Sequence, residues 1–238
     1  MSGAAEHADV ETSSDAYARR FAGPVGEYFL DVQARTTLAL LPKAATVLDV
    51  GGGHGQLAGP LVDAGHVVTV FASDPACIHR VRGLVDAGRA RFESGDLLKL
   101  PFGDRSFDVA LAFRLLPHVS EWRALVGELC RVAAQAVIVD YPTTRSVNAV
   151  SGAFFGAKKG VEGDTRPFAV FADDDVRSAF ATHGFDAETR RPQFLFPMAL
   201  HRALGTAALS QGAEAIASVA GLTTLLGSPV ILKATRRD

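Results

Sequence analysis

Four glycines in five positions, Gly51 to Gly53 and Gly55, are the feature that most constrains this chain. The apolar run TVLDV (46–50) precedes them, and QLAGPL (56–61) follows with apolar residues at helical spacing. This order is typical of a turn from a β-strand into an α-helix. A turn that needs glycine only for its backbone angles needs one or two, whereas four open the main chain to a ligand. We therefore expect a ligand on the backbone N–H groups of this turn.

Short β-branched runs alternate with windows of helical length along the 238 residues. Seven such runs are predicted strands: 46–50, 66–72, 90–92, 107–113, 136–141, 185–191 and 229–235. Helical patterns occupy 10–22 and 26–40, with Gly23-Pro24 between them, and then 56–64, 76–88, 120–132, 171–185 and 197–226. Strands that are apolar on both faces and alternate with helices are typical of a parallel sheet between helical layers. The predicted fold is α/β: a Rossmann-like, doubly wound, mostly parallel seven-stranded sheet with N-terminal helices and helical insertions.

Three acidic residues lie at or just after the carboxyl ends of predicted strands, where ligands of doubly wound folds bind. Asp49 ends the first strand, and a carboxylate there repels a pyrophosphate but suits an ammonium or sulfonium group. Asp74 follows the second strand, where an acid receives ribose hydroxyls, and Asp96 follows the third. The pattern indicates a nucleoside that carries positive charge. The dinucleotide fingerprint G-x-G-x-x-G/A also fits the turn, which keeps an NAD(P)-dependent oxidoreductase as an alternative.

Three stretches, VLDVGGGHG, SDP and GDLLKLPFGDRSFDVALAFRLLPHV, resemble segments of the class I S-adenosylmethionine-dependent methyltransferases, and in particular the small-molecule, type 11-like family. They are similar to its first motif, its ribose-binding segment and its adenine-contacting and post-strand segments. The resemblance implies an enzyme with S-adenosyl-L-methionine as its cofactor. It also implies a single methyltransferase domain over 1–238, with a helical lid (1–40), a cofactor-binding half (41–142) and an acceptor-binding and C-terminal half (143–238).

For the cofactor, the resemblance implies that Asp49 holds the methionine end, Asp74 the ribose hydroxyls, and Asp96 with the Leu97 backbone the adenine. The acid of SDP comes slightly late, after Phe71-Ala72-Ser73. The predicted cofactor-binding residues are Asp49, Gly51, Gly52, Gly53, Gly55, Asp74, Pro75, Asp96, Leu97, Phe113 and Arg114.

His118 and Tyr17 are the predicted catalytic residues. Methyl transfer depends on in-line positioning, and a base is needed only where the acceptor must lose a proton. A histidine titrates near working pH when unperturbed, so His118 suits that base; the alternative is that it caps or supports a helix starting near Ser120. Tyr17 with Phe21 resembles the family's N-terminal lid, and ordinary helix packing is the alternative. Arg114 either binds an anionic acceptor or closes over the cofactor carboxylate.

Apolar side chains after the fifth strand favour a small, apolar or aromatic methyl acceptor, with core packing as the alternative. They include Phe154, Phe155, Phe168, Phe194, Phe196 and Met198. A third hypothesis is a non-catalytic nucleoside-binding module that contacts a protein or lipid surface through the Ala-, Gly- and Leu-containing stretch 203–226.

Composition narrows the partners. The formal net charge is −2 and no basic block is present, so nucleic acid is not expected. The N-terminus has no apolar signal segment and polar residues interrupt 203–232, so we expect a cytoplasmic protein without a transmembrane segment. The two cysteines lack a metal-ligand spacing, so no metal is expected. A homodimer is compatible with the sequence.

Overall fold

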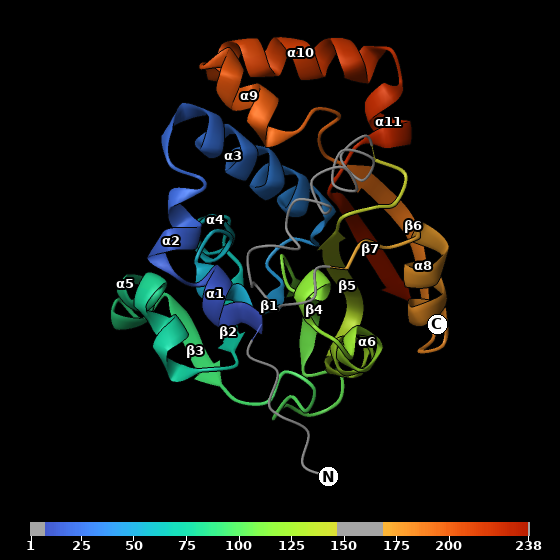
Figure 1. The fold of residues 1–238 in the computed structure, drawn as a ribbon. Helices are drawn as coiled ribbons and strands as arrows, with labels where there is room; N and C mark the ends of the chain where they lie inside the picture. The colour runs from blue at the N-terminus through green and yellow to red at the C-terminus, as the bar shows by residue number, and fades with distance from the viewer. Residues whose placement is uncertain (1–7, 147–168, 238) are drawn as a thin grey trace, which may run out of the picture.

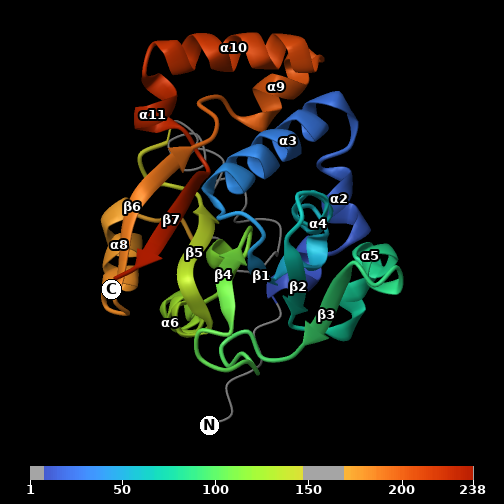
Figure 2. The same cartoon turned by 180° about the vertical axis from the view of Figure 1, so that it is seen from behind.

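Seven strands pair into one sheet in the computed structural model, which describes residues 8–146 and 169–237 (Figure 1). They are β1 (Thr46–Val50), β2 (Val67–Ala72), β3 (Ala90–Ser94), β4 (Phe107–Ala112), β5 (Ala133–Tyr141), β6 (Phe185–Pro192) and β7 (Val230–Arg236). Their order is β3-β2-β1-β4-β5-β7-β6. The first five strands pair in parallel, and β7 lies antiparallel between β5 and β6 (Figure 2). This confirms the predicted mostly parallel, seven-stranded α/β sheet.

The central strands are buried on both faces, which explains why their sequences do not alternate between apolar and polar residues. Successive residues of a strand point to opposite faces. In β1, Val47 belongs to one apolar cluster and Leu48 to the other, and both are 0% exposed. The two clusters are the cores between the sheet and its two helical layers.

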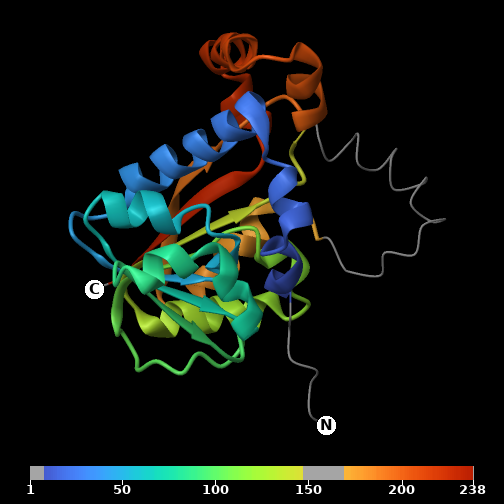
Figure 3. The same ribbon diagram turned by 90° about the vertical axis from the view of Figure 1, so that its left-hand side faces the viewer.

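Each described α-helix overlaps a predicted window, and the window 197–226 holds three of them. The described α-helices are α1 (Ala8–Thr12), α2 (Asp15–Arg19), α3 (Gly23–Leu40), α4 (Ala58–Asp63), α5 (Arg82–Asp86), α6 (Trp122–Val132), α8 (Asp173–Ala181), α9 (Met198–Leu204), α10 (Ala207–Val219) and α11 (Leu222–Leu226). Among the described residues, the short 3₁₀ helices are η1 (Gly52–His54), η2 (Pro75–Arg80) and η3 (Leu116–His118). Figure 3 shows α1 and α2 beside the carboxyl ends of the parallel strands. No helix among the described residues is long and apolar enough to cross a bilayer.

The N-terminal helices differ from the prediction in their boundaries. Gly23-Pro24 was expected to separate two helices, but α3 begins there, because proline fits the first turn of a helix, where its missing N–H costs nothing. The predicted first helix is divided into α1 and α2. Ser14 makes that division, since its Oγ accepts a hydrogen bond from the Tyr17 N–H (3.1 Å) and caps α2.

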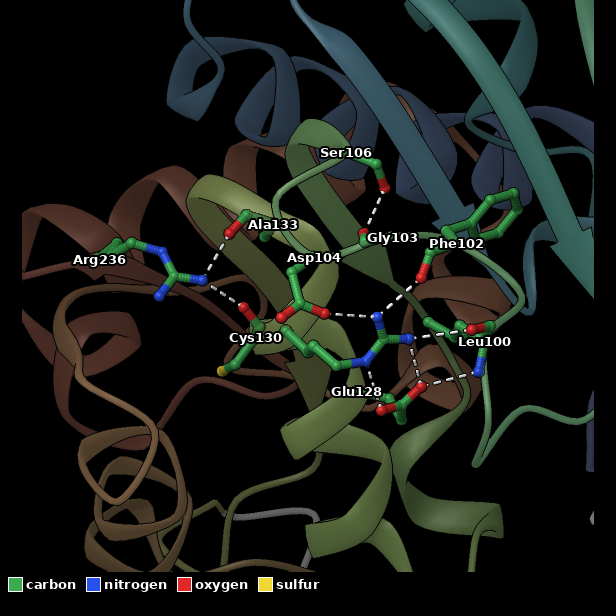
Figure 4. Close-up of polar contacts among 10 residues, drawn as sticks. Leu100, Phe102, Gly103, Asp104, Ser106, Glu128, Cys130, Ala133 and Arg236 are labelled. Atoms are coloured by element: carbon green, nitrogen blue, oxygen red, sulfur yellow. Dashed lines mark hydrogen bonds and ion pairs between the residues drawn. The ribbon is translucent and has the colours of Figure 1, made fainter.

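The loop from 95 to 106 joins β3 to β4, and Arg131 ties it to α6. Figure 4 labels the partners of this arginine, among them Leu100, Phe102 and Glu128. The Arg131 guanidinium donates to the carbonyl oxygens of Leu100 (2.9 Å) and Phe102 (2.7 Å) and to the carboxylates of Glu128 (2.8 Å) and Asp104 (2.9 Å). The hydrogen bond from Arg131 holds the pKa of Glu128 below its usual range. This network fixes the loop that starts at the predicted adenine-contacting residues.

Candidate cofactor and acceptor site

The glycine turn lies at the carboxyl end of β1, beside the ends of the two neighbouring strands. The Gly51 N–H donates to the Phe71 carbonyl (2.7 Å), and the Gly95 N–H donates to the Ala72 carbonyl (2.9 Å). Gly51 and Gly55 have φ angles of 73° and 71°, in the left-handed region that glycine adopts without a steric cost. The carboxyl ends of β1, β2 and β3 therefore lie side by side.

Asp49 lies under this turn as a buried carboxylate. It is 0% exposed, and neither carboxylate oxygen has a hydrogen-bond partner within the described part of the chain. Burial raises the pKa of Asp49 to about 7. A buried acid without a donor fits a ligand that brings its own, such as the ammonium of the methionine end of S-adenosylmethionine.

The segment that begins with α1 covers the turn. Asp9 is 0% exposed, and its carboxylate accepts hydrogen bonds from the Ser73 N–H (2.8 Å) and the Ser73 hydroxyl. A Cβ built on Gly53 would lie 2.5 Å from the Ser13 Oγ and 2.7 Å from the Cys77 Cβ. Gly53 is thus closely covered by Ser13, which follows α1, and by Cys77 of η2.

Asp74 lies beyond the end of β2 rather than on it. The strand ends at Ala72, and the Asp74 carboxylate accepts a hydrogen bond from the Ala76 N–H (2.7 Å) at the start of η2, where Pro75 is exposed. The carboxylate hydrogen-bonded to this strand end is that of Asp9, which lies 65 residues earlier than Asp74 in the sequence.

The remaining predicted cofactor residues divide into exposed and buried ones. Asp96 is exposed, and its carboxylate accepts a hydrogen bond from the Leu98 N–H (2.8 Å). Leu97 is 0% exposed and Phe113 is 1% exposed, so both belong to the core beneath the edge. The side chains of Leu97 and Phe113 therefore pack in the core, away from solvent.

Arg114 and Leu115 follow β4 and connect the glycine turn to a second polar group. A Cβ on Gly51 would lie 2.9 Å from a Leu115 methyl, so Leu115 packs directly on the turn. The Arg114 N–H donates to Asp140 Oδ1 (2.5 Å), and its guanidinium donates to Gln33 Oε1 (3.0 Å). Arg114 has a φ of 56°, a left-handed conformation that is uncommon for a residue with a side chain.

A pocket of about 280 Å³ opens beside Arg114. Its apolar lining comes from Tyr17, Phe21, Phe29, Phe194, Phe196 and Met198. Its polar groups include Gln33, Arg114, His118 and Asp140. The pocket thus contains both predicted catalytic residues and three of the predicted acceptor residues. Phe154, Phe155 and Phe168 lie outside the described residues.

His118 and Tyr17 come to the pocket from different elements. His118 is the last residue of η3, and the N-cap position of α6 is Glu121. Tyr17 lies on α2, with its ring centroid 5.8 Å from that of Phe21 and 5.9 Å from the Arg114 guanidinium carbon. These rings and the guanidinium form one edge of the pocket.

Comparison with known proteins identifies relatives of this chain. Residues 47–136 match the family described as a methyltransferase domain. A methyltransferase of Mycobacterium avium (strain 104) is 30% identical over 172 residues, which cover 71% of this chain and 63% of the relative. A methyltransferase of Mycolicibacterium gilvum (strain PYR-GCK) is 37% identical over 99 residues, covering 41% and 38%. The chain is therefore similar to methyltransferases over 71% of its length. It spans less than two thirds of the length of these curated relatives.

Solved structures agree with this chain in fold. Magnesium protoporphyrin IX methyltransferase from Synechocystis PCC 6803, with bound SAH, has a TM-score of 0.65 at 16% identity and covers 94% of each chain. The YcgJ protein of Bacillus subtilis has a TM-score of 0.60 at 17% identity, covering 89% of this chain and 99% of its own. At such identities the likeness shows the shared fold.

Glu214 of α10 fixes the aromatic wall of the pocket. Its buried carboxylate accepts hydrogen bonds from the N–H groups of Leu195 (2.9 Å) and Phe196 (3.0 Å) and contacts His201 Nε2 (3.0 Å). The ring of Phe194 stacks on the ring of Phe29 from α3, with centroids 3.9 Å apart. One carboxylate therefore holds the segment that carries two pocket side chains.

Replacing Glu214 with alanine is expected to lower the free energy of unfolding by about 3 kcal/mol, because two buried N–H groups and a buried histidine lose their acceptor. Urea unfolding of both proteins measures the difference. Glu27→Ala, at an exposed position of α3, is the control and should stay within about 0.5 kcal/mol of wild type. A loss below about 1 kcal/mol for Glu214→Ala would mean that water replaces the carboxylate.

Sequence reasoning missed three buried polar residues of the candidate site: Asp9, Gln33 and Asp140. Asp140 had a usable signal, because VIVDY ends an apolar strand with an acid in the same way as TVLDV does at Asp49. Gln33 had none, since its partner Asp140 is 107 residues away.

Proposed function

We propose that this methyltransferase transfers a methyl group from S-adenosylmethionine to a small molecule with an apolar or aromatic body. The observation that supports this is the pocket of about 280 Å³, whose aromatic lining adjoins Arg114 at the same sheet edge as the glycine turn. A ligand on the turn and an acceptor in the pocket would be neighbours, as in-line transfer requires.

We propose that the following residues bind the cofactor. Asp49 would accept the ammonium of its methionine end, and the glycine turn would allow close approach to the main chain. Asp96 with the Leu97 backbone would bind the adenine, and Asp74 with Pro75 would border the ribose. When bound, the cofactor supplies an activated methyl group on a sulfonium.

For the acceptor side we propose that His118 accepts a proton from the reacting group and that Tyr17 closes the pocket from α2. His118 lines the pocket and is not the N-cap of α6, which favours this role over helix capping. Proton acceptance by His118 is needed only if the acceptor is a hydroxyl or an acidic carbon.

Two measurements test the proposed function. Calorimetric titration with S-adenosylmethionine, S-adenosylhomocysteine and NADH is expected to show binding of the first two. An acceptor panel of aromatic and apolar metabolites is incubated with methyl-deuterated S-adenosylmethionine and analysed by mass spectrometry. We expect a product that carries a trideuteromethyl group in place of one acceptor hydrogen. Binding of NADH alone would instead support the oxidoreductase.

A second candidate is the non-catalytic module, which the surface of α10 and α11 favours. Ile216, Val219 and Leu225 are 74%, 91% and 65% exposed there. Apolar side chains exposed together are typical of contact surfaces. Cofactor binding without any product, together with co-purification of a protein or lipid partner, would support this module.

A further inference from the structure

Asp140 is a buried acid at the floor of the acceptor pocket. It is the penultimate residue of β5, is 4% exposed, and lines the pocket together with Gln33 of α3 and Arg114 after β4. A buried carboxylate is costly unless hydrogen bonds and charges compensate it. Its partners therefore indicate what the pocket is arranged to bind.

The hydrogen bonds of Asp140 leave accepting capacity on its carboxylate. Within the described part of the chain, Oδ1 accepts a hydrogen bond from the Arg114 N–H (2.5 Å), and Oδ2 accepts a long one from Gln33 Nε2 (3.3 Å). The backbone N–H of Asp140 itself is a third donor to this carboxylate. An ionised carboxylate offers about four acceptor sites, so these donors do not saturate it.

The charge of Asp140 is likewise only partly compensated. Burial raises the pKa of Asp140 to about 6, and the positive charge of Arg114 opposes this rise. The Arg114 guanidinium does not form a bidentate pair with the carboxylate: it donates to Gln33 and lies 3.9 Å from the ring centroid of Phe21. Above pH 6 the floor is therefore a carboxylate with room for another donor.

An anionic group would fit this floor poorly. It would lie against the Asp140 carboxylate. Gln33 accepts one N–H of the Arg114 guanidinium and the Phe21 ring lies over its face, whereas the buried Arg114 Nε has no partner among the described residues. Around the floor, the lining from Phe29, Phe194 and Phe196 is aromatic. An aromatic ring can pack on these side chains while a polar substituent reaches inward.

We propose that Asp140 selects the acceptor, which is an aromatic molecule that presents a hydroxyl or amine hydrogen to its carboxylate. The inference rests on the proposed function for the meaning of "acceptor", but it concerns the binding preference of the pocket itself. Asp140 is thus a specificity residue that touches the acceptor, separate from the group that takes the proton.

Four probes of one ring size test this preference without knowledge of the natural acceptor. Benzylamine, benzyl alcohol, toluene and benzoate are titrated into the full chain at pH 8, and dissociation constants come from NMR shifts of protein amides. We expect benzylamine and benzyl alcohol to bind at least about tenfold more tightly than toluene and benzoate, because each donates to Asp140. Equal or tighter binding of benzoate, or no binding of any probe, would overturn the proposal.

Asp140→Asn provides the matched variant, since it keeps the shape and removes the charge. Benzylamine is expected to lose at least about tenfold in affinity and toluene to change less than about twofold. Met198→Leu, which alters the wall but not the floor, is expected to keep the wild-type ranking. An unchanged benzylamine affinity in folded Asp140→Asn would contradict the proposal, and if that variant does not fold, the wild-type ranking decides alone.

The outcome is separable from that of the proposed function. Probe binding needs no methyl transfer, so a confirmed ranking with no methylated product would leave the pocket preference and remove the activity. Methylation of acceptors that carry a carboxylate in place of a donor would do the reverse.

Discussion

Asp49→Asn is expected to abolish measurable binding of S-adenosylmethionine and, at pH 8, to make the folded protein more stable. The proposed role of Asp49 is to pair with the ammonium of the cofactor, and loss of a buried charged partner costs roughly 100-fold or more in affinity. Without the cofactor, however, the same carboxylate is buried and has no partner within the described residues. Its removal therefore relieves a cost.

The pH dependence of the stability gain follows from the pKa of Asp49, which burial raises from 3.8 to about 7. Between these pH values the folded chain keeps a proton that the unfolded chain has lost, so wild-type stability falls as pH rises through this window and stays low above it. Asparagine does not titrate. The melting temperature should therefore rise by roughly 5 °C at pH 8 and change little near pH 4.

Calorimetry at pH 8 and thermal melts at both pH values measure the two effects. Asp31→Asn, at an exposed position of α3, is the control and should alter neither. Wild-type affinity in a folded Asp49→Asn protein would show that the carboxylate does not contact the cofactor.

His118→Ala is expected to lower kcat by about 10²–10⁴ with an acceptor that must lose a proton, because a positioned base contributes that much to such a step. Cofactor affinity should not change, since His118 lines the acceptor pocket rather than the glycine turn. Steady-state kinetics with the acceptor found in the mass-spectrometric screen measure kcat, and calorimetry measures cofactor affinity.

His183→Ala is the matched control, because His183 is exposed and packs near Gly127 of α6, away from the residues that line the pocket. It should leave kcat unchanged. Near-wild-type turnover of His118→Ala with a lowered melting temperature would make His118 a packing residue and leave positioning alone to account for the rate.

The strands were predictable because their signal is local. A buried strand in a parallel sheet is a short run of apolar residues, and β1 was predicted at 46–50 and lies at Thr46–Val50. Boundaries set by a single side chain were harder. Ser14 divides α1 from α2 by capping the second helix, and the helical period continues through it without a break.

The site was predictable where one segment carries it and unpredictable where distant segments meet. The glycine turn and Asp49 lie within seven residues of sequence, from 49 to 55. The floor of the pocket needs α3, the end of β4 and the end of β5 together, and no local pattern links Gln33 to Arg114, which is 81 residues away. The position of Asp9 on the end of β2 likewise depends on how α1 docks.

If the cofactor and the acceptor bind as proposed, the adjacency of Leu115 and Arg114 would link their binding thermodynamically. Leu115 packs on Gly51, and Arg114 holds Asp140 and Gln33. A ligand that displaces Leu115 from the turn therefore perturbs the floor of the pocket through a single peptide unit. Linkage is reciprocal, so whatever factor the cofactor applies to acceptor affinity, the acceptor must apply to cofactor affinity. The cofactor dissociation constant of the acceptor-free protein would then differ, by that same factor, from the constant measured with the pocket filled.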